Sequence, residues 1–248
     1  MKILFLGYNE SETCLIKFLR DHDYNIVQRK DKITPEESKN FDFIISYGYK
    51  HIIKEDVISQ FKNKIINLHI SYLPYNRGTN PNFWSFYEST PAGVTIHILD
   101  RGIDTGDILV QKKIIFEESE NTFRKTYNRL RNEIENLFKE NYQALLHCNI
   151  IPKKQEGIGT YHKLVDLPSN IKNWDINIKE YLNNMKNNET DLEIINDIEA
   201  ARTKNNVNWM DILRIAVTHA PTETKKLITK INEQDNNISA LLDKLSKN

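Results

Sequence analysis

The sequence predicts a Rossmann-like α/β fold with a mainly parallel sheet, followed by a small all-α C-terminal appendage. The first part of the chain alternates short apolar runs with stretches of helical spacing, which is the pattern of βαβ units. At 248 residues, 39% of them hydrophobic, the chain can bury the core of one such domain and of a smaller companion. After about residue 182 only the helical spacing continues.

Strands are expected where apolar residues follow one another directly or alternate with polar ones. Such runs stand at residues 2–6, 26–27, 41–45, 64–69, 93–99 and 108–116. Apolar residues recur every three or four positions around residues 14–19, 57–61 and 122–146, which predicts helices. The last two strands bracket a turn at residues 104–107 and should form a hairpin, while the longest helix should cover one face of the sheet.

The end of the chain is expected to form a separate module. Residues 1–182 are assigned to the main domain, the Asn-rich residues 183–189 to a linker and residues 190–248 to a helical module. Within this module, helical spacing predicts helices at residues 190–203, 208–219, 221–233 and 236–246. Their apolar stripes need a partner, which is either the other helices or another subunit.

Composition excludes several classes of function. The 34 Lys and Arg balance the 34 Asp and Glu, so the charge pattern of a nucleic-acid or anionic-membrane binder is absent. Cys14 and Cys148 lie far apart and belong to no CxxC pair, which favours a reduced, cytoplasmic protein. No apolar stretch approaches about 20 residues and the N-terminal apolar run is too short for a signal peptide, so we expect no membrane segment.

Two candidate catalytic residues lie at the end of the predicted strand at residues 64–69. Asn67 and His69 are two positions apart in a strand, so their side chains point to the same side. A carboxamide can stabilise the oxyanion of acyl transfer, and an imidazole can take a proton from an attacking amine. A carboxylate is needed to orient the imidazole, and Asp104 is the candidate. Taken singly, His69 could equally be a structural residue and Asp104 a turn former.

Residues 67–74, which read N-L-H-I-S-Y-L-P, resemble the N-x-H-x-S-x-L-P motif of the folate-dependent formyltransferases. Arg77 and Gly78 follow, and His97 and the segment D-T-G-D-I at residues 104–108 continue the resemblance. This family includes glycinamide ribonucleotide transformylase, methionyl-tRNA formyltransferase and the sugar N-formyltransferases. The resemblance covers roughly residues 1–167 and implies the formyltransferase fold.

The resemblance also implies roles for individual residues. Asn67 corresponds to the family Asn that binds the formyl oxygen, His69 to the His that assists proton transfer, and Asp104 to the Asp that orients this pair. It implies N10-formyltetrahydrofolate as co-substrate and no metal. Two segments, 46–53 and 99–103, are similar to the loops that hold the folate. The residues expected to bind it are Tyr47, His51, Ile52, Ile53, Leu99 and Asp100.

The acceptor amine is expected to belong to a nucleotide-linked amino sugar. Residues 75–85 look like the R-G-x-x-P-N-x-W-S stretch of enzymes that formylate dTDP-3-amino- or 4-amino-dideoxyhexoses for surface glycans. An Arg fork suits a phosphate and aromatic faces suit a sugar or base, so the expected substrate-binding residues are Tyr75, Arg77, Asn80 and Trp84. For Trp84, core packing is the alternative.

Other acceptors remain as alternatives. Glycinamide ribonucleotide fits less well, because Glu10 follows the first strand where that enzyme has a phosphate loop. Methionyl-tRNA fits less well, because the C-terminal part is slightly acidic. A non-catalytic formyltransferase-like assembly component is the third alternative. Residues 159–167 and Trp174-Asp175 also look like the sugar enzymes, but the helical end does not, and we expect the chain to form a homodimer.

Overall fold

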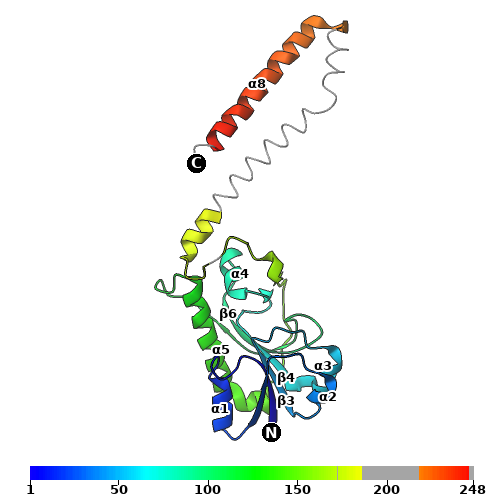
Figure 1. Ribbon diagram of the computed structural model, residues 1–248, viewed down its shortest axis with the longest axis vertical. Coiled ribbons are helices and arrows are strands. Elements are labelled where there is room, and N and C mark those ends of the chain that lie inside the picture. The colour runs from blue at the N-terminus through cyan, green and yellow to red at the C-terminus, as the bar shows by residue number, and fades with distance from the viewer. Residues whose placement is uncertain (172, 186–217, 246–248) are drawn as a thin grey trace. The chain divides into compact units, whose positions relative to one another are not determined.

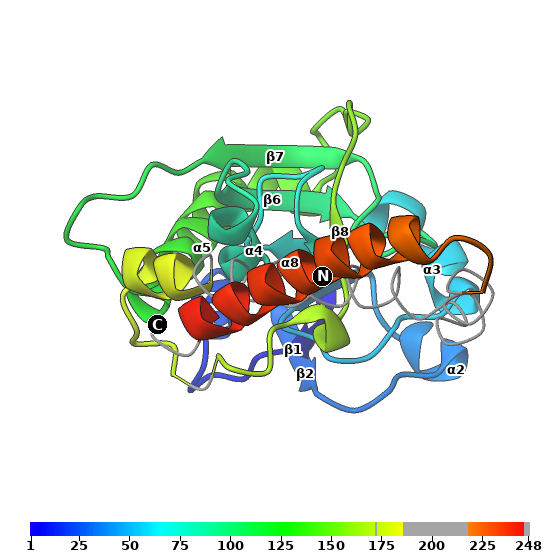
Figure 2. The ribbon, with the colours of Figure 1, turned by 90° about the horizontal axis from the view of Figure 1, so that it is seen from above.

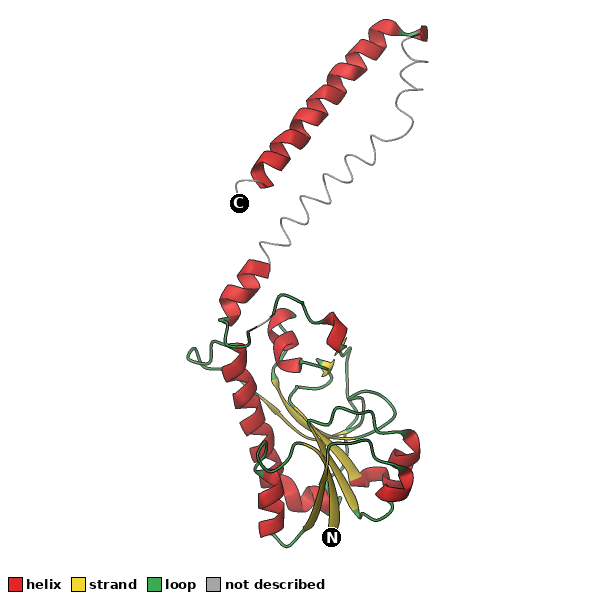
Figure 3. Ribbon diagram, viewed as in Figure 1, coloured by secondary structure: helices red, strands yellow, loops and turns green. Residues whose placement is uncertain are grey.

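The computed structural model describes residues 1–171, 173–185 and 218–245 (Figure 1). The chain divides into two compact units, Met1–Ile178 and Lys179–Asn248. The first unit contains strands flanked by helices, and the described part of the second contains helices (Figure 3). The expected α/β fold with a helical C-terminal appendage is therefore confirmed.

The strands of the main sheet lie in the order β2-β1-β3-β4-β6-β7. Their bounds are β1 Lys2–Gly7, β2 Asn25–Arg29, β3 Phe43–Tyr47, β4 Ile65–His69, β6 Gly93–Ile98 and β7 Ile108–Lys113. The first four in chain order run parallel, while β6 pairs antiparallel with both β4 and β7. Figure 2 shows β7 beside β6 at the edge of the sheet, so the expected hairpin is present.

Helices cover both faces of this sheet because its buried strands are apolar on both sides. In β1, Ile3 and Phe5 belong to one apolar cluster with helices α1 and α5, while Leu4 and Leu6 belong to a second cluster with α3. The helices of the first unit are α1 Leu15–Asp21, α2 Pro35–Ser38, α3 Glu55–Phe61, α4 Pro81–Tyr87 and α5 Phe123–Leu146.

The long helix α5 agrees with its expected range of residues 122–146. Thr122 is its N-cap, and the Thr122 side chain accepts a hydrogen bond from the Lys125 N–H. Leu130, Ile134 and Phe138 recur every four positions and are buried against the sheet. The opposite, polar side of α5 carries charged residues, so the apolar stripe fixes how the helix is rotated on the sheet.

Several short elements of the first unit are not apparent from sequence periodicity. They include helices α2 and α4 and the short strands β5, Arg77–Gly78, and β8, Tyr161–His162. β5 and β8 pair in parallel and join the segment after β4 to the segment after α5. Gly78 has a φ of +89°, and a Cβ there would lie 2.3 Å from the His162 carbonyl oxygen, so this pairing requires a glycine.

The C-terminal unit differs from expectation in two respects. Helix α8, Pro221–Leu245, is one continuous helix where two were expected, because Asn and Asp near position 235 lower helix propensity only slightly and no Gly or Pro interrupts the run. Residues 183–185, expected to begin a linker, are helical. The expected helix at 190–203, the rest of the linker and most of the helix at 208–219 lie outside the described residues. Among the described residues, no helix is long and apolar enough to cross a membrane.

Removing a core ring should test the packing of α5. Phe138 is 0% exposed, so Phe138→Ala is expected to lower the free energy of unfolding by about 3–5 kcal/mol. Ile115 is 84% exposed, and Ile115→Ala should change it by less than about 0.5 kcal/mol. Urea unfolding followed by circular dichroism measures both. Equal unfolding midpoints for the two variants would contradict the packing described.

Candidate active site

Two neighbouring strands and one turn bring the candidate catalytic residues together. Asn67 and His69 belong to β4, and Asn67 stands directly opposite His97 of β6. Asp104 lies in the turn between β6 and β7, where its φ of +52° is in the left-handed region. Asp and Asn tolerate this conformation better than most residues, which is one reason an Asp can occupy the position.

The Asp104 carboxylate is the centre of the polar network. One of its oxygens, Oδ1, accepts a hydrogen bond from Asn67 Nδ2 at 3.1 Å, and the other, Oδ2, accepts one from the Gly78 N–H at 2.8 Å. His97 Nε2 lies 3.4 Å from Oδ1 and His69 Nε2 lies 3.7 Å from Oδ2. The side chain is only 9% exposed, so these partners replace water around a buried charge.

Backbone carbonyl groups fix the orientation of the His97 and His69 rings, and His97 in turn fixes that of the Asn67 amide. His97 Nδ1 lies 2.8 Å from the Ile98 carbonyl oxygen and therefore carries a proton, which leaves Nε2 to accept from Asn67 Nδ2 at 3.3 Å. Asn67 consequently turns its NH₂ group, and not its oxygen, towards the network. His69 Nε2 lies 3.2 Å from the Asn76 carbonyl oxygen, so a neutral His69 keeps its lone pair on Nδ1.

Electrostatics keep the carboxylate ionised and the imidazole neutral. Burial alone would raise the pKa of Asp104, but the neighbouring His69 and His97 and the Gly78 N–H hold that pKa well below the usual range. Burial lowers the pKa of His69, and the Asp104 carboxylate opposes this shift only in part. Near neutral pH the site therefore holds a base next to a negative charge that would stabilise its protonated form.

Gln155 fixes the backbone of the turn that carries Asp104. Its Nε2 donates to the carbonyl oxygens of Asp104 and Gly106, both at 2.8 Å. Its Oε1 accepts from Arg77 Nε at 3.0 Å and from Arg77 Nη2 at 2.7 Å. Arg77, expected to bind substrate, therefore uses one side of its guanidinium to hold Gln155, and through Gln155 the turn that carries Asp104.

A cavity of about 370 Å³ opens beside Asn67, His69 and Asp104. Its walls are the loop after β3 and the loop after β6, and it includes every residue expected to bind folate: Tyr47, His51, Ile52, Ile53, Leu99 and Asp100. Ile52 is 81% exposed at this cavity, while Ile53 is packed in the core around α3. Asp100 accepts hydrogen bonds from the Gly102 N–H at 3.1 Å and from Thr105 Oγ1 at 2.6 Å, which shapes the second loop.

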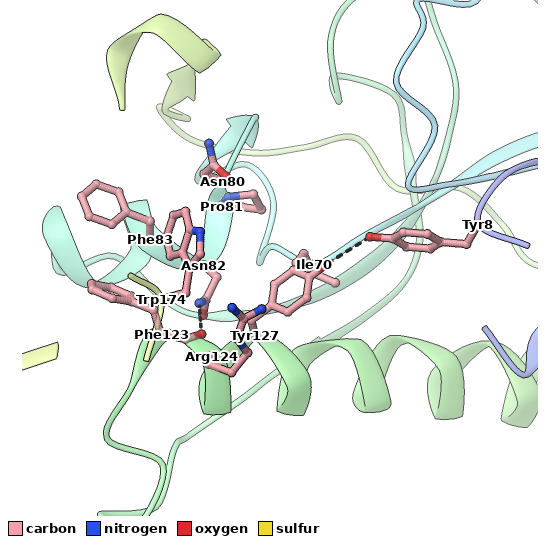
Figure 4. A pocket seen from close by; sticks show the side chains of 10 residues that line it. All are labelled: Tyr8, Ile70, Asn80, Pro81, Asn82, Phe83, Phe123, Arg124, Tyr127 and Trp174. Atoms are coloured by element: carbon pink, nitrogen blue, oxygen red, sulfur yellow. Dashed lines mark hydrogen bonds between the residues drawn. The ribbon is translucent and has the colours of Figure 1, made fainter. Parts of the chain in front are cut away.

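The expected substrate-binding residues separate into two groups. Asn80 lines a second cavity, of about 360 Å³, beside the starts of α4 and α5 (Figure 4). Tyr75, Arg77 and Trp84 line neither cavity in the described part of the chain. Trp84 is 6% exposed and stacks on His162 with ring centroids 3.9 Å apart, because α4 packs against the β5–β8 pair. Trp84 therefore packs in the core, which was the alternative to substrate binding.

Sequence reasoning did not identify three residues of the cavity wall. Tyr8 follows β1, while Tyr127 and Arg131 are four positions apart on α5 and so share one face of the helix. The Tyr8 and Tyr127 hydroxyls are 3.0 Å apart, and the Arg131 guanidinium lies 4.3 Å from the Tyr8 ring centroid. The sequence signal for Tyr127 and Arg131 was that two polar residues, four positions apart, interrupt the apolar side of the predicted helix.

The family model described as "Formyl transferase" matches residues 19–141. The crystal structure of the formyltransferase PseJ from Anoxybacillus kamchatkensis, in complex with UDP-4,6-dideoxy-4-formamido-L-AltNAc and tetrahydrofolate, is 43% identical, with a TM-score of 0.68. The match covers 72% of this chain and 96% of PseJ. The N-formyltransferase from Helicobacter canadensis, solved with folinic acid and dTDP-3-aminofucose, is 25% identical, with a TM-score of 0.57 and coverage of 69% and 73%.

Curated sequences give a second kind of relative. The methionyl-tRNA formyltransferase of Finegoldia magna is 37% identical over 94 residues, which are 38% of this chain and 28% of that protein. Alignments with two further methionyl-tRNA formyltransferases cover 50% and 47% of their lengths. The chain thus spans half or less of these curated relatives, whereas it spans nearly all of PseJ.

The protonation of His69 can be measured directly. Since burial lowers its pKa, the His69 imidazole should titrate below the ordinary value of 6.5. The unfolded chain then binds more protons than the folded one, so protonating His69 should cost stability as the pH falls below about 6.5. Asp104→Asn removes the opposing charge and should lower the midpoint further. Long-range ¹H–¹⁵N NMR, with His69→Gln for assignment, reads the titration, and a midpoint at or above 6.5 would contradict this environment.

Proposed function

Because this chain belongs to the formyltransferase family, we propose that it transfers a formyl group from N10-formyltetrahydrofolate to the primary amine of a nucleotide-linked amino sugar. The observation that carries the proposal is 43% identity over 96% of PseJ, a structure solved with a formamido sugar nucleotide and tetrahydrofolate. The convergence of Asn67, His69 and Asp104 at one cavity supports the same reaction.

The proposed acceptor is a UDP-linked 4-amino-dideoxy sugar. PseJ was solved with a UDP sugar that carries its formamide at position 4, whereas the Helicobacter canadensis enzyme, at lower identity, was solved with a dTDP-linked 3-amino sugar. Methionyl-tRNA is the second candidate, because curated relatives of that name match part of the chain. One fact argues against it: the formal charge of this chain is +0, whereas binding of tRNA favours a positively charged surface.

The cavity suits a reduced folate. Its two loops offer apolar side chains for a flat ring, including Ile52 and Leu99, together with backbone groups that can bind ring nitrogens. Its volume of about 370 Å³ is in the range of small-ligand sites. N10-formyltetrahydrofolate, when bound, supplies the formyl carbon.

Asn67 and His69 have complementary tasks in the proposed reaction. The acceptor amine must attack in its neutral form, and negative charge then develops on the formyl oxygen. Asn67 Nδ2 can donate to that oxygen by giving up its weaker contact with His97, which is 3.3 Å long. His69, neutral near pH 7, accepts the proton that leaves the amine nitrogen. It returns a proton to N10 of the folate as the bond between N10 and the formyl carbon breaks, so that tetrahydrofolate leaves.

Asp104 is proposed to support both groups. Its charge stabilises His69 once that ring is protonated, and its hydrogen bond keeps Asn67 turned towards the reacting carbonyl. No side chain forms a covalent bond to the transferred group in this scheme. Among the described residues, no cluster of three His, Cys, Asp or Glu side chains is arranged to hold a metal ion.

Substitutions at the three positions should separate chemistry from folding. Asn67→Ala, His69→Gln and Asp104→Asn are each expected to lower kcat by about 100-fold or more, because each removes a group that acts in the transition state. Glu118→Gln makes the same carboxylate-to-amide change at an exposed position and should retain wild-type kcat. Steady-state kinetics, together with circular dichroism to confirm folding, measure the effect. Wild-type turnover in a folded His69→Gln variant would reject the role of this base.

The acceptor can be identified from a panel of amines. With N10-formyltetrahydrofolate, the protein should add one formyl group to a UDP-linked 4-amino-dideoxy sugar, as detected by mass spectrometry. The same assay should include a dTDP-linked 3-amino sugar, glycinamide ribonucleotide and methionyl-tRNA, with Asp104→Asn as the control for uncatalysed transfer. Formylation of methionyl-tRNA or glycinamide ribonucleotide, without formylation of either sugar, would overturn the proposed acceptor.

A further inference from the structure

The segment that follows α5 returns to the candidate active site. Lys153 pairs with Ile108, the first residue of β7, through two backbone hydrogen bonds of 2.7 and 2.8 Å. The chain then reaches β8, which pairs with β5. Residues 153–162 thus run from the turn that carries Asp104 to the loop after β4. The matched family model ends at residue 141, so this segment lies outside it.

We propose that residues 153–162, here called the return segment, hold His69 and Asp104 in position, with Gln155 and Thr160 as the positioning residues. Gln155 acts on the turn that carries Asp104, and Thr160 acts on the loop whose carbonyl group orients His69. Neither side chain lines one of the two cavities. The inference rests on the proposed function for its effect on the rate of formyl transfer, but not for the positioning itself.

The Gln155 amide binds two carbonyl groups of the turn at once. Both hydrogens of its NH₂ group are used, one for the Asp104 carbonyl oxygen and one for that of Gly106, each at 2.8 Å. Arg77 donates to Gln155 Oε1 from Nε and Nη2, and this contact keeps the NH₂ group directed at the turn. A carboxylate at position 155 would keep the contact with Arg77 but would place an acceptor against two other acceptors.

The turn needs such a restraint because its geometry is demanding. Asp104 has a φ of +52°, and a residue with a Cβ adopts this region at a cost. Its carboxylate must also meet Asn67 Nδ2 at 3.1 Å and the Gly78 N–H at 2.8 Å. Hydrogen bonds weaken steeply away from their preferred geometry, so a small displacement of the turn would misalign Asn67 and weaken the support for a protonated His69.

Thr160 restrains His69 through Asn76. Thr160 Oγ1 accepts a hydrogen bond from the Asn76 N–H at 2.8 Å and donates one to Asn76 Oδ1 at 3.2 Å. Asn76 is buried and has a φ of +56°, so both contacts hold a backbone conformation that is otherwise unfavourable. The Asn76 carbonyl oxygen lies 3.2 Å from His69 Nε2. A change at position 160 should therefore reach His69 through a single intervening residue.

The return segment lies close against the loop after β4. The Thr160 carbonyl oxygen accepts a hydrogen bond from the Arg77 N–H at 3.0 Å. A Cβ on Gly159 would lie 2.4 Å from the Pro74 carbonyl oxygen, so the two backbones approach to a distance that a side chain would prevent. Residues 156–158 between these contacts are exposed. The segment therefore contacts the site at Gln155 and at residues 159–160, which are the positions that the proposal uses.

Gln155→Glu tests the contact with the turn. The change replaces the donors by an acceptor at nearly the same size, so kcat should fall about tenfold or more while KM for N10-formyltetrahydrofolate stays within about threefold. Gln143→Glu makes the same change at an exposed position of α5 and should keep wild-type kcat. Steady-state kinetics measure both, and equal kcat values for the two variants would overturn the role of Gln155.

A double-mutant cycle separates positioning from a general loss of stability. When Asp104 is already replaced by Asn, Gln155→Glu should lower kcat by less than about threefold, because the turn no longer carries a carboxylate to align. Two independent defects would instead multiply. A full tenfold loss in both backgrounds would overturn the proposal.

Thr160→Val and Thr160→Ser test the second contact without requiring turnover. Val removes Oγ1, so the Asn76 carbonyl should hold His69 less well, and the His69 midpoint in ¹H–¹⁵N NMR should fall below that of the wild type. Ser keeps the hydroxyl and should restore the wild-type midpoint. If the wild-type protein formylates no amine, the proposed function fails, and this midpoint alone decides the inference. An unchanged midpoint in a folded Thr160→Val variant would overturn it.

Discussion

The buried carboxylate of Asp104 is the group on which the candidate active site depends. It connects three strands. It accepts hydrogen bonds from Asn67 on β4 and from the Gly78 N–H on β5, and it lies 3.4 Å from His97 Nε2 on β6. A charge that is 9% exposed is tolerated only when donors surround it, so the same contacts that stabilise the ion also fix the reacting groups. The pairing of β5 with β8 positions the Gly78 N–H, and Gln155 holds the backbone of the turn that carries Asp104.

The topology explains why both cavities lie at this edge of the sheet. β1, β3 and β4 run parallel, so the residues that follow them reach the same edge of the sheet, where open α/β folds bind ligands. The loop after β3 forms one wall of the catalytic cavity, and Tyr8 after β1 stands between that cavity and the second one. Asn67 and His69 line the catalytic cavity, next to Ile70, which lines both cavities.

Sequence patterns were sufficient for the strands of the sheet and for α5, because each has a strong local signal. Asn67, His69 and Asp104 were selected by a motif resemblance, and the fold brings them together. Uninterrupted apolar runs mark buried parallel strands, and the spacing of Asn67 and His69 determines their common side. Sequence patterns were insufficient where the role of a residue depends on contacts with residues distant in the sequence. Arg77 could not be linked to Gln155, 78 positions away, and Trp84 could not be linked to His162. Asn82 belongs to the stretch at residues 75–85, but its hydrogen bond to the Phe123 carbonyl oxygen, 41 positions away, could not be predicted from the sequence.

The central claim is that Asn67, His69 and Asp104 surround the carbonyl of the group that is transferred. A crystal structure with 10-formyl-5,8-dideazafolate, a stable analogue with the formyl group on N10, tests it most directly. We expect the ring system between the loops at residues 48–53 and 99–103, and the formyl oxygen about 3 Å from Asn67 Nδ2. A formyl group directed away from Asn67 and His69, or an analogue bound outside this cavity, would contradict the account.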